Sequence, residues 1–208
     1  MKLHITPNSP YARMARIVVI EKGLQDQVEV VLAKTRTPDS PYYGINPSGR
    51  VPFLERDDGP GFEDSPLICR YLDHLDGKPG LHPDETKEGW EIRRLAAMAR
   101  SMLDGLALWG REFLYRPDGM RSQTIIDHEM ARCGRMCDAF ETEIDNPHLT
   151  GPLNIAQITL GCALTGAGSD KRFGPDWCKD HPKLAAWAAT IAFRPSFEAT
   201  RPVPPQPH

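Results

Sequence analysis

The sequence lacks the features of a membrane protein, a secreted protein or a nucleic-acid-binding protein. It has no apolar run long enough to cross a bilayer, and its first residues, Met1 to Ile5, enter an alternating strand pattern without the apolar core of a signal peptide. Its net charge is −3 and its pI is about 6.2, and the sequence contains no stripe of basic residues. We therefore expect a cytoplasmic protein that binds neither nucleic acid nor membrane.

Cysteine pairs at short spacing are also missing. The five cysteines are odd in number and scattered, and none forms a C-x-x-C pair, which argues against a disulfide framework or a zinc knuckle. No H-E-x-x-H motif is present. His128, Cys133 and Cys137 could nominally ligate a metal from one helix, but both cysteines fall in its apolar stripe, so core packing is the better interpretation. We expect reduced thiols and no metal.

What the chain does have is the composition of an ordinary globular protein. Hydrophobic residues make up 40% of the chain and charged residues 25%. Its length of 208 residues is sufficient for one large or two small domains. Proline is abundant, with 20 residues, about twice the average share. Many of these prolines stand where an element is expected to begin, which indicates many short, well-delimited elements.

The first third of the chain has the pattern of a strand, a helix and a second strand. Leu3 and Ile5 alternate with polar neighbours, a helix is expected from Pro10 through Lys22 with Gly23 ending it, and residues 28–32 alternate again. Such a unit of about thirty residues predicts a right-handed βαβ crossover with parallel strands.

Residues 46–75 have the densest set of structural signals. Residues 34–45 read as a loop with at most one helical turn, 46–50 as a turn, 51–54 as a short strand, 57–61 as a hairpin connection and 65–75 as a helix. Pro52 removes a ladder donor, so one side of its strand lacks a partner or faces a ligand. Ser65 precedes Pro66 and is the expected N-cap. The helix start suits a carboxylate and Asp64 an ammonium, as in an amino-acid head group, although a plain capped helix has the same pattern.

This motif resembles the glutathione site of the glutathione S-transferase family. The resemblance rests on Val51 and Pro52, followed about a dozen residues later by Asp64, Ser65 and Ile68. It implies that the Val51 backbone pairs with the cysteinyl backbone of glutathione beside a cis-proline at Pro52. It also implies that Asp64 and Ser65 hold the γ-glutamyl end.

The resemblance covers residues 1 to about 200 and has further implications. Arg50 matches the basic residue that often precedes the valine and is expected near the glycyl end of glutathione. The fold it implies is an α/β thioredoxin-like N-terminal domain of order βαβ–ββα, followed by an all-α C-terminal domain. The implied activity is that of a cytoplasmic, homodimeric, bacterial-type glutathione transferase that acts in detoxification, with glutathione as co-substrate and a small hydrophobic electrophile.

The turn between the first strand and the first helix is the expected catalytic position. Ser9 immediately precedes Pro10, so its hydroxyl and the neighbouring N–H groups can point at a ligand thiol and favour the thiolate. A plain N-cap looks the same in sequence. Tyr11 is the competing catalytic hydroxyl and Asn8 a weaker third candidate. Residues 9–12 lack the C-x-x-C of thioredoxin-like redox proteins, so glutathione must bring the sulfur.

The remainder of the chain has helical periodicity. Apolar stripes are expected on a long helix from residue 95 to 113 and on another from 126 to 144, and these two should pair antiparallel. A third helix, nearly apolar all round, follows a capping box of Asn154 and Gln157. We expect residues 1–77 as the thioredoxin-like domain, 78–85 as a linker, 86–201 as the helical domain and 202–208 as a disordered tail.

Two questions of function stay open at this point. Met102, Leu106 and Trp109 are core residues first, but one edge of their helix could form an apolar substrate pocket. The alternatives to a transferase are a non-catalytic glutathione or apolar-ligand binding protein, and a glutathione-dependent isomerase or thioltransferase, which share the same glutathione site.

Overall fold

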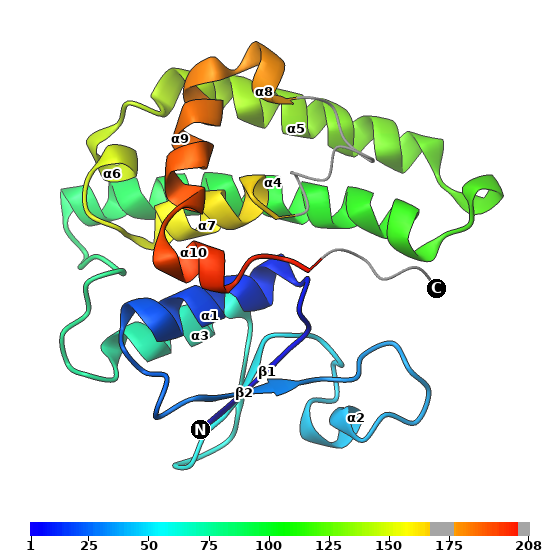
Figure 1. The fold of residues 1–208 in the computed structure, drawn as a ribbon, viewed down its shortest axis with the longest axis vertical. Coiled ribbons are helices and arrows are strands. Elements are labelled where there is room, and N and C mark those ends of the chain that lie inside the picture. The colour runs from blue at the N-terminus through cyan, green and yellow to red at the C-terminus, as the bar shows by residue number, and fades with distance from the viewer. Residues whose placement is uncertain (167–176, 204–208) are drawn as a thin grey trace. The chain divides into compact units, whose positions relative to one another are not determined.

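A computed structural model describes residues 1–166 and 177–203, which divide into two units (Figure 1). The first unit comprises Met1–His82 together with the segment from Pro195 onward, and the second comprises Pro83–Arg194. Residues 167–176, and residues 204–208, which make up most of the expected tail, lie outside the described residues. No helix within the described ranges is both long enough and apolar enough to span a membrane.

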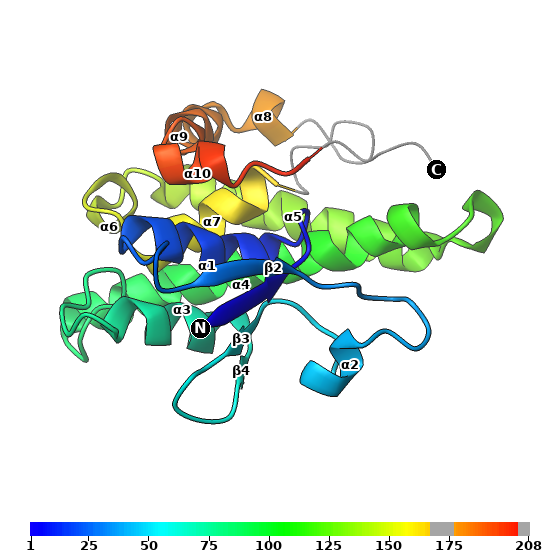
Figure 2. The same ribbon diagram turned by 60° about the horizontal axis from the view of Figure 1, so that its bottom comes forward.

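The first unit is built on a four-stranded sheet. Its strands are β1 (Lys2–Ile5), β2 (Glu29–Leu32), β3 (Phe53–Glu55) and β4 (Phe62–Glu63), in the order β2-β1-β3-β4. β1 and β2 are parallel, whereas β3 pairs antiparallel with both β1 and β4. The helices α1 (Pro10–Glu21) and α3 (Ser65–His74) pack together on one side of the sheet. The short α2 (Tyr42–Ile45) follows β2 and precedes β3 in the chain, and it lies away from the strands (Figure 2). This confirms the βαβ–ββα order.

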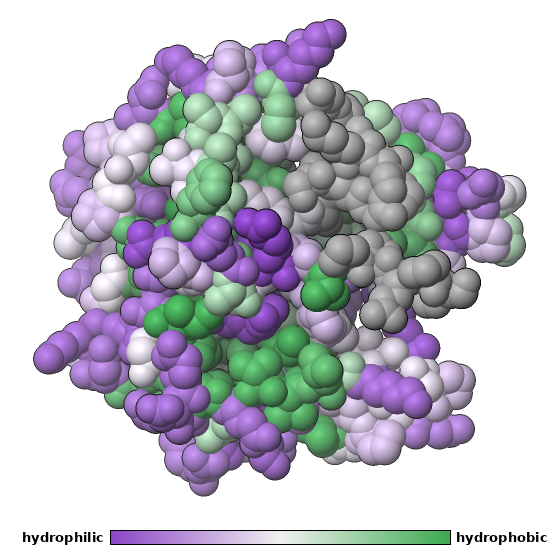
Figure 3. Space-filling model, in the orientation of Figure 1, coloured by the Kyte–Doolittle hydropathy of each residue, from purple (hydrophilic) through white to green (hydrophobic). Residues whose placement is uncertain are grey.

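Apolar side chains explain why these elements pack together. Leu3 and Ile5 alternate along β1 and are buried, and α1 contributes Ile17 and Val18 to the same core. α1 ends before Gly23, whose φ of +63 lies in the left-handed region that glycine adopts without strain. β2 forms one end of the described sheet, and its Val30 and Leu32 are 46% and 70% exposed. Figure 3 shows an apolar patch on the face of the first unit that is turned to the viewer.

Two details of the 51–75 stretch differ from the sequence interpretation. β3 begins at Phe53, so Val51 and Pro52 precede the strand instead of belonging to it. The N-cap of α3 is Asp64, and Ser65 is already helical. Both differences have a physical reason: Pro52 cannot donate a ladder hydrogen bond, and Asp64 adopts a φ of +80, which no helical residue has.

The second unit consists of helices. They are α4 (Lys87–Tyr115), the 3-10 turn η1 (Asp118–Met120), α5 (Gln123–Glu143), α6 (Pro147–Thr150), α7 (Ile155–Leu164), α8 (Trp177–Asp180) and α9 (Pro182–Ala192). α4 packs against both α5 and α7, and the short connection between α4 and α5 makes these two run antiparallel, as expected (Figure 1). Cys133 and Cys137 are buried on α5 together with Phe140, which agrees with core packing.

α7 is buried along its whole length. Asn154 caps it, because its Oδ1 accepts hydrogen bonds from the amides of Ala156 and Gln157 at 3.0 and 3.3 Å. The expected capping box is incomplete, since the Gln157 side chain does not return to the Asn154 amide. It donates instead to three carbonyls of α6 and the turn after it, which need partners in this position; they belong to His148, Gly151 and Pro152.

The last described helix, α10 (Pro195–Ala199), belongs to the first unit, whereas the sequence analysis grouped residues up to 201 with the helical domain. The reason is a buried cation on α1. Arg13 is 3% exposed, and its guanidinium donates to the Phe197 carbonyl at 3.0 Å and to the Thr200 hydroxyl at 3.3 Å. A buried guanidinium needs such acceptors, so α10 completes the first unit.

Candidate functional site

Strand register brings three separate segments to one edge of the sheet. β1 and β3 pair His4 with Phe53, so the register extended by two residues sets Thr6 opposite Val51. β3 and β4 pair Phe53 with Glu63, so Asp64 stands opposite Pro52. The turn that carries Ser9, the Val51–Pro52 step and the start of α3 therefore meet at the same edge, as the sequence motif requires.

The Val51–Pro52 step leaves backbone groups available for a ligand. Its peptide bond is cis. Neither the amide nor the carbonyl of half-buried Val51 has a hydrogen-bond partner among the residues that the structure describes. Because backbone donors and acceptors away from water are almost always paired, a free pair at a strand end is suited to an extended peptide that adds itself to the sheet edge.

The turn before this step is held by polar side chains. The Arg50 carbonyl accepts a hydrogen bond from the Tyr42 hydroxyl at 2.5 Å and another from the Asn46 side-chain amide at 3.0 Å. Ser48 accepts from the Arg50 amide at 3.1 Å and donates to the Glu63 carboxylate at 2.5 Å. The turn is therefore attached to β4.

Sequence reasoning treated Tyr42 and Asn46 as loop and turn residues and missed their contacts. The property that indicates their structural role is burial, since they are 4% and 2% exposed, and burial is seen only in the structure. Burial raises the pKa of Tyr42, Asn46 opposes the rise by its hydrogen bond, and the Glu63 carboxylate adds to it. The hydroxyl therefore stays protonated and remains a donor.

The start of α3 presents the groups that suit a charged head group. Ser65 is buried at the first helical position, and the exposed Asp64 precedes it with its backbone in the left-handed region. A non-glycine residue at such a φ costs of order 1–3 kcal/mol, and residues of this kind cluster at functional sites. The N-terminal end of a helix carries a partial positive charge, so a carboxylate is favoured at Ser65.

Ser9 lies at the N-cap of α1, with its Oγ accepting from the Ala12 amide at 3.2 Å. This is the plain capping role that the sequence left open, but it uses only an acceptor lone pair. The hydroxyl proton remains available to a thiolate. Tyr11, one residue into the helix, is half-buried, and Asn8 is exposed and accepts from the Val203 amide at 2.9 Å.

The remaining candidates are Arg50, which adjoins this edge in the chain, and three residues of α4 in the second unit. Arg50 is exposed in the turn before Val51. Met102, Leu106 and Trp109 lie on α4 in the second unit, where all three are buried and the Trp109 ring packs 4.9 Å from Phe113. In residues 1–166 and 177–203, no group of three or more His, Cys, Asp or Glu residues is arranged to hold a metal ion.

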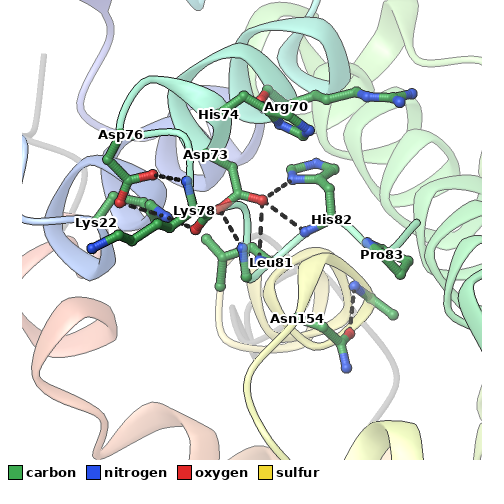
Figure 4. A network of polar contacts seen from close by, with 12 residues as sticks. Lys22, Arg70, Asp73, His74, Asp76, Lys78, Leu81, His82, Pro83 and Asn154 are labelled. Atoms are coloured by element: carbon green, nitrogen blue, oxygen red, sulfur yellow. Dashed lines mark hydrogen bonds and ion pairs between the residues drawn. The ribbon is translucent and has the colours of Figure 1, made fainter.

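A second polar cluster lies at the opposite end of α3 (Figure 4). Asp73 is fully buried and accepts hydrogen bonds from the backbone amides of Gly80, Leu81 and His82 at 3.1, 3.0 and 2.8 Å. The His82 ring and the Lys22 ammonium also contact it, at 3.1 and 3.3 Å. This network fixes the chain that leaves α3, and its distance along the helix from Ser65 indicates a structural role.

A comparison with family models and curated proteins identifies similar sequences. The family model described as glutathione S-transferase, N-terminal domain, matches residues 8–75. The uncharacterized GST-like protein YibF of Escherichia coli K12 is 29% identical over 203 residues, which cover 97% of this chain and 98% of YibF.

Solved structures are similar over the whole chain. A glutathione S-transferase from Methylobacillus flagellatus KT with GSH bound has a TM-score of 0.86 and 30% identity, covering 97% of this chain and 99% of that one. A glutathione transferase family member from Pseudomonas fluorescens Pf-5, with bound S-(propanoic acid)-glutathione, has a TM-score of 0.83 and 32% identity, covering 98% and 100%.

Proposed function

Because the chain belongs to the glutathione S-transferase family, we propose that it binds glutathione at the sheet edge and stabilises its thiolate for attack on a small hydrophobic electrophile. At the level of the family, the expected enzyme class and the two-part fold are confirmed. The observation that carries the proposal is the free Val51 backbone, which lies beside a cis-proline and level with both the Ser9 turn and the start of α3.

In the proposed complex, glutathione lies extended along this edge. Its cysteinyl backbone pairs with the amide and carbonyl of Val51, as an added strand would. Its γ-glutamyl carboxylate meets the first turn of α3 at Ser65, and its ammonium meets Asp64. The glycyl end lies near Arg50.

Ser9 then acts on the sulfur. A free thiol has a pKa of about 8.5, and each unit of depression corresponds to about 1.4 kcal/mol. One charge-assisted hydrogen bond from the Ser9 hydroxyl supplies roughly 1.5–3 kcal/mol, enough to make the thiolate the main form near neutral pH. The Ser9 oxygen keeps its bond from the Ala12 amide while its proton is donated to sulfur.

The reaction follows from the thiolate. With an aryl halide as electrophile, the sulfur lone pair forms a C–S bond, the C–halogen bond breaks, and halide leaves with the bonding electrons. The thiol proton has already passed to solvent. We propose Met102, Leu106 and Trp109 as the apolar surface against which the electrophile is held. A cytoplasmic homodimer that acts in detoxification completes this proposal.

Calorimetry and a conjugation assay test the proposal. We expect glutathione to bind at millimolar concentration or below and to be conjugated to a generic aryl halide. Absence of binding would contradict both the transferase and the binding-protein alternative. If glutathione binds but a panel of electrophiles does not react, the non-catalytic binding protein is correct. If the panel shows isomerisation or thiol–disulfide exchange instead, that alternative replaces conjugation.

A further inference from the structure

The orientation of the Val51 amide is decided by side chains that the proposed function does not use. In a planar trans peptide, the carbonyl and the N–H point in opposite directions. The Arg50–Val51 peptide is trans, since the cis bond of the described residues is the one that follows it. Whatever holds the Arg50 carbonyl therefore sets the direction of the Val51 N–H.

That carbonyl is held by two donors. Tyr42 Oη lies 2.5 Å and Asn46 Nδ2 lies 3.0 Å from the Arg50 oxygen. A carbonyl oxygen has two lone pairs, so these two bonds saturate it. The orientation of the Asn46 amide is not ambiguous, because its Oδ1 accepts from the Ser48 amide at 3.2 Å, which leaves Nδ2 to donate.

The two donors are themselves fixed. Tyr42 is 4% exposed, and its ring centroid lies 5.5 Å from that of buried His4 on β1. Asn46 is 2% exposed at the end of α2. Neither side chain can swing away without opening the core of the first unit, so the Arg50 carbonyl is held on the buried side and the Val51 N–H is directed to the opposite side.

We propose that Tyr42 and Asn46 are positioning residues of the glutathione site, which point the Val51 amide at the cysteinyl carbonyl of glutathione. This inference rests on the proposed function and adds to it two residues that touch neither ligand nor reacting atoms. Ser48 also helps to fix the position of Arg50, since its hydroxyl accepts from the Arg50 amide and donates to the Glu63 carboxylate of β4.

The chain offers a matched pair of variants for the test. Tyr42→Phe removes the hydroxyl that holds the Arg50 carbonyl. Tyr43→Phe is the same substitution one position along, at a tyrosine whose hydroxyl has no partner among the described residues. Calorimetry with glutathione should give a Kd raised about three- to tenfold for Tyr42→Phe, the equivalent of one neutral hydrogen bond, and a change below about twofold for Tyr43→Phe.

A second readout separates positioning from general stability. The pKa of bound glutathione, followed by the ultraviolet absorbance of its thiolate, should be the same in Tyr42→Phe as in the unchanged protein, because Tyr42 acts on the backbone contact. Tyr42→Phe should raise the Kd of S-methylglutathione by the same factor as the Kd of glutathione. A purely structural role predicts a lower Tm with unchanged Kd for both ligands, and this result would overturn the proposal.

A second variant covers the possibility that one substitution misfolds. Asn46→Asp keeps the acceptor for Ser48 but sets an oxygen against the Arg50 carbonyl, so we expect a larger rise in Kd than for Tyr42→Phe. If the unchanged protein binds glutathione and both folded variants bind it equally well, the positioning role is wrong while the proposed function stands. If the unchanged protein does not bind, both fall together.

Discussion

At the scale of single residues, Ser9 shows how one hydroxyl can serve structure and chemistry together. Its oxygen accepts from the Ala12 amide and caps α1, while its proton is left over. The sequence could locate this residue, since a serine before a proline marks a helix start. It could not show which way the proton points.

Replacing Ser9 separates it from Tyr11. Ser9→Ala should lower kcat/KM for an aryl halide about 10- to 100-fold and shift the pH–rate profile to higher pH, because the bound thiol loses a charge-assisted hydrogen bond and its pKa rises. The variant should also lose about 1 kcal/mol of stability with the cap. Tyr11→Phe should change neither. Steady-state kinetics across pH measure this, and the reverse pattern would assign catalysis to Tyr11.

Asp73 fixes the conformation of the segment that follows α3. Asp73→Asn should lower the free energy of unfolding by about 2–4 kcal/mol, because a buried carboxylate that accepts three backbone amides cannot be matched by a side-chain amide. Asp76→Asn is the control, since Asp76 is exposed and pairs with Lys22 at 3.1 Å, and little change is expected. Urea titration compares the two variants.

The same carboxylate gives a pH dependence. Burial by itself raises the pKa of Asp73, but hydrogen bonds from the Gly80 and His82 amides and from the His82 ring outweigh it and hold the pKa below its usual value. The stabilisation is therefore complete above about pH 4 and is lost as the pH falls further. The stability difference between the unchanged protein and Asp73→Asn should shrink over that range; a constant difference would contradict this explanation.

At the scale of elements, the start of α7 is the most exacting helix end. Asn154→Ala should cost about 1–2 kcal/mol, because it removes the cap of two buried amides and the 2.7 Å hydrogen bond to the His148 carbonyl. Ser122→Ala is the matched control on α5, where the cap accepts one hydrogen bond at 3.4 Å, and a smaller loss is expected. Thermal unfolding of both variants measures this, and equal losses would contradict it.

His181, at the start of α9, should contribute stability with the opposite pH dependence to that of Asp73. His181 faces two acceptors, the Trp177 carbonyl at 2.8 Å and the Asp138 carboxylate at 2.9 Å, so both ring nitrogens donate in the protonated form. Burial lowers its pKa, but the Asp138 hydrogen bond, the Trp177 carbonyl and the nearby charges of Asp138 and Glu141 outweigh it, and the net pKa is raised.

A raised histidine pKa contributes stability below about pH 6.5 that is lost as the pH rises through the folded value. The stability advantage of the unchanged protein over His181→Gln should therefore be largest in mild acid and decline toward alkaline pH. Urea titrations at a series of pH values measure it. An advantage that grew with pH would contradict the two-acceptor geometry.

Elements were the part of the structure most accessible from sequence. The strand–helix–strand spacing predicted the parallel pairing of β1 and β2, and apolar stripes predicted α4 and α5. The segment of α7 was predicted from its cap and from apolar residues all round. The exact edges of β3 and α3 were not predictable, since they depend on the backbone angles at Pro52 and Asp64. The hydrogen bonds from Tyr42 and Asn46 to the Arg50 carbonyl were not predicted, because no periodic pattern in a sequence indicates a bond between a side chain and the carbonyl of another residue.

At the scale of the whole molecule, the return of α10 to α1 was also invisible in the sequence. A short segment after a proline carries no mark of the surface on which it will pack. Arg13 contributes to this packing, because a buried guanidinium requires acceptors and both the Phe197 carbonyl of α10 and the Thr200 hydroxyl supply them.

A double-mutant cycle tests this closure. Arg13→Met and Thr200→Val should each lower the free energy of unfolding, and the two losses should fail to add by about 0.5–3 kcal/mol, because the residues share one hydrogen bond across 187 positions. Chemical denaturation of the four proteins gives the coupling energy. Additive losses would mean that Thr200 is not a partner of Arg13.

The discontinuous first unit has a consequence for synthesis on the ribosome. α10 is translated after every residue of the helical unit, so a nascent chain that has exposed the sheet, α1 and α3 still lacks the Phe197 carbonyl and the Thr200 hydroxyl that accept from Arg13. The simple order in which an N-terminal domain folds before the next one emerges cannot apply. The first unit is therefore completed only after the whole helical unit has been synthesised, when α10 becomes available to pack against α1.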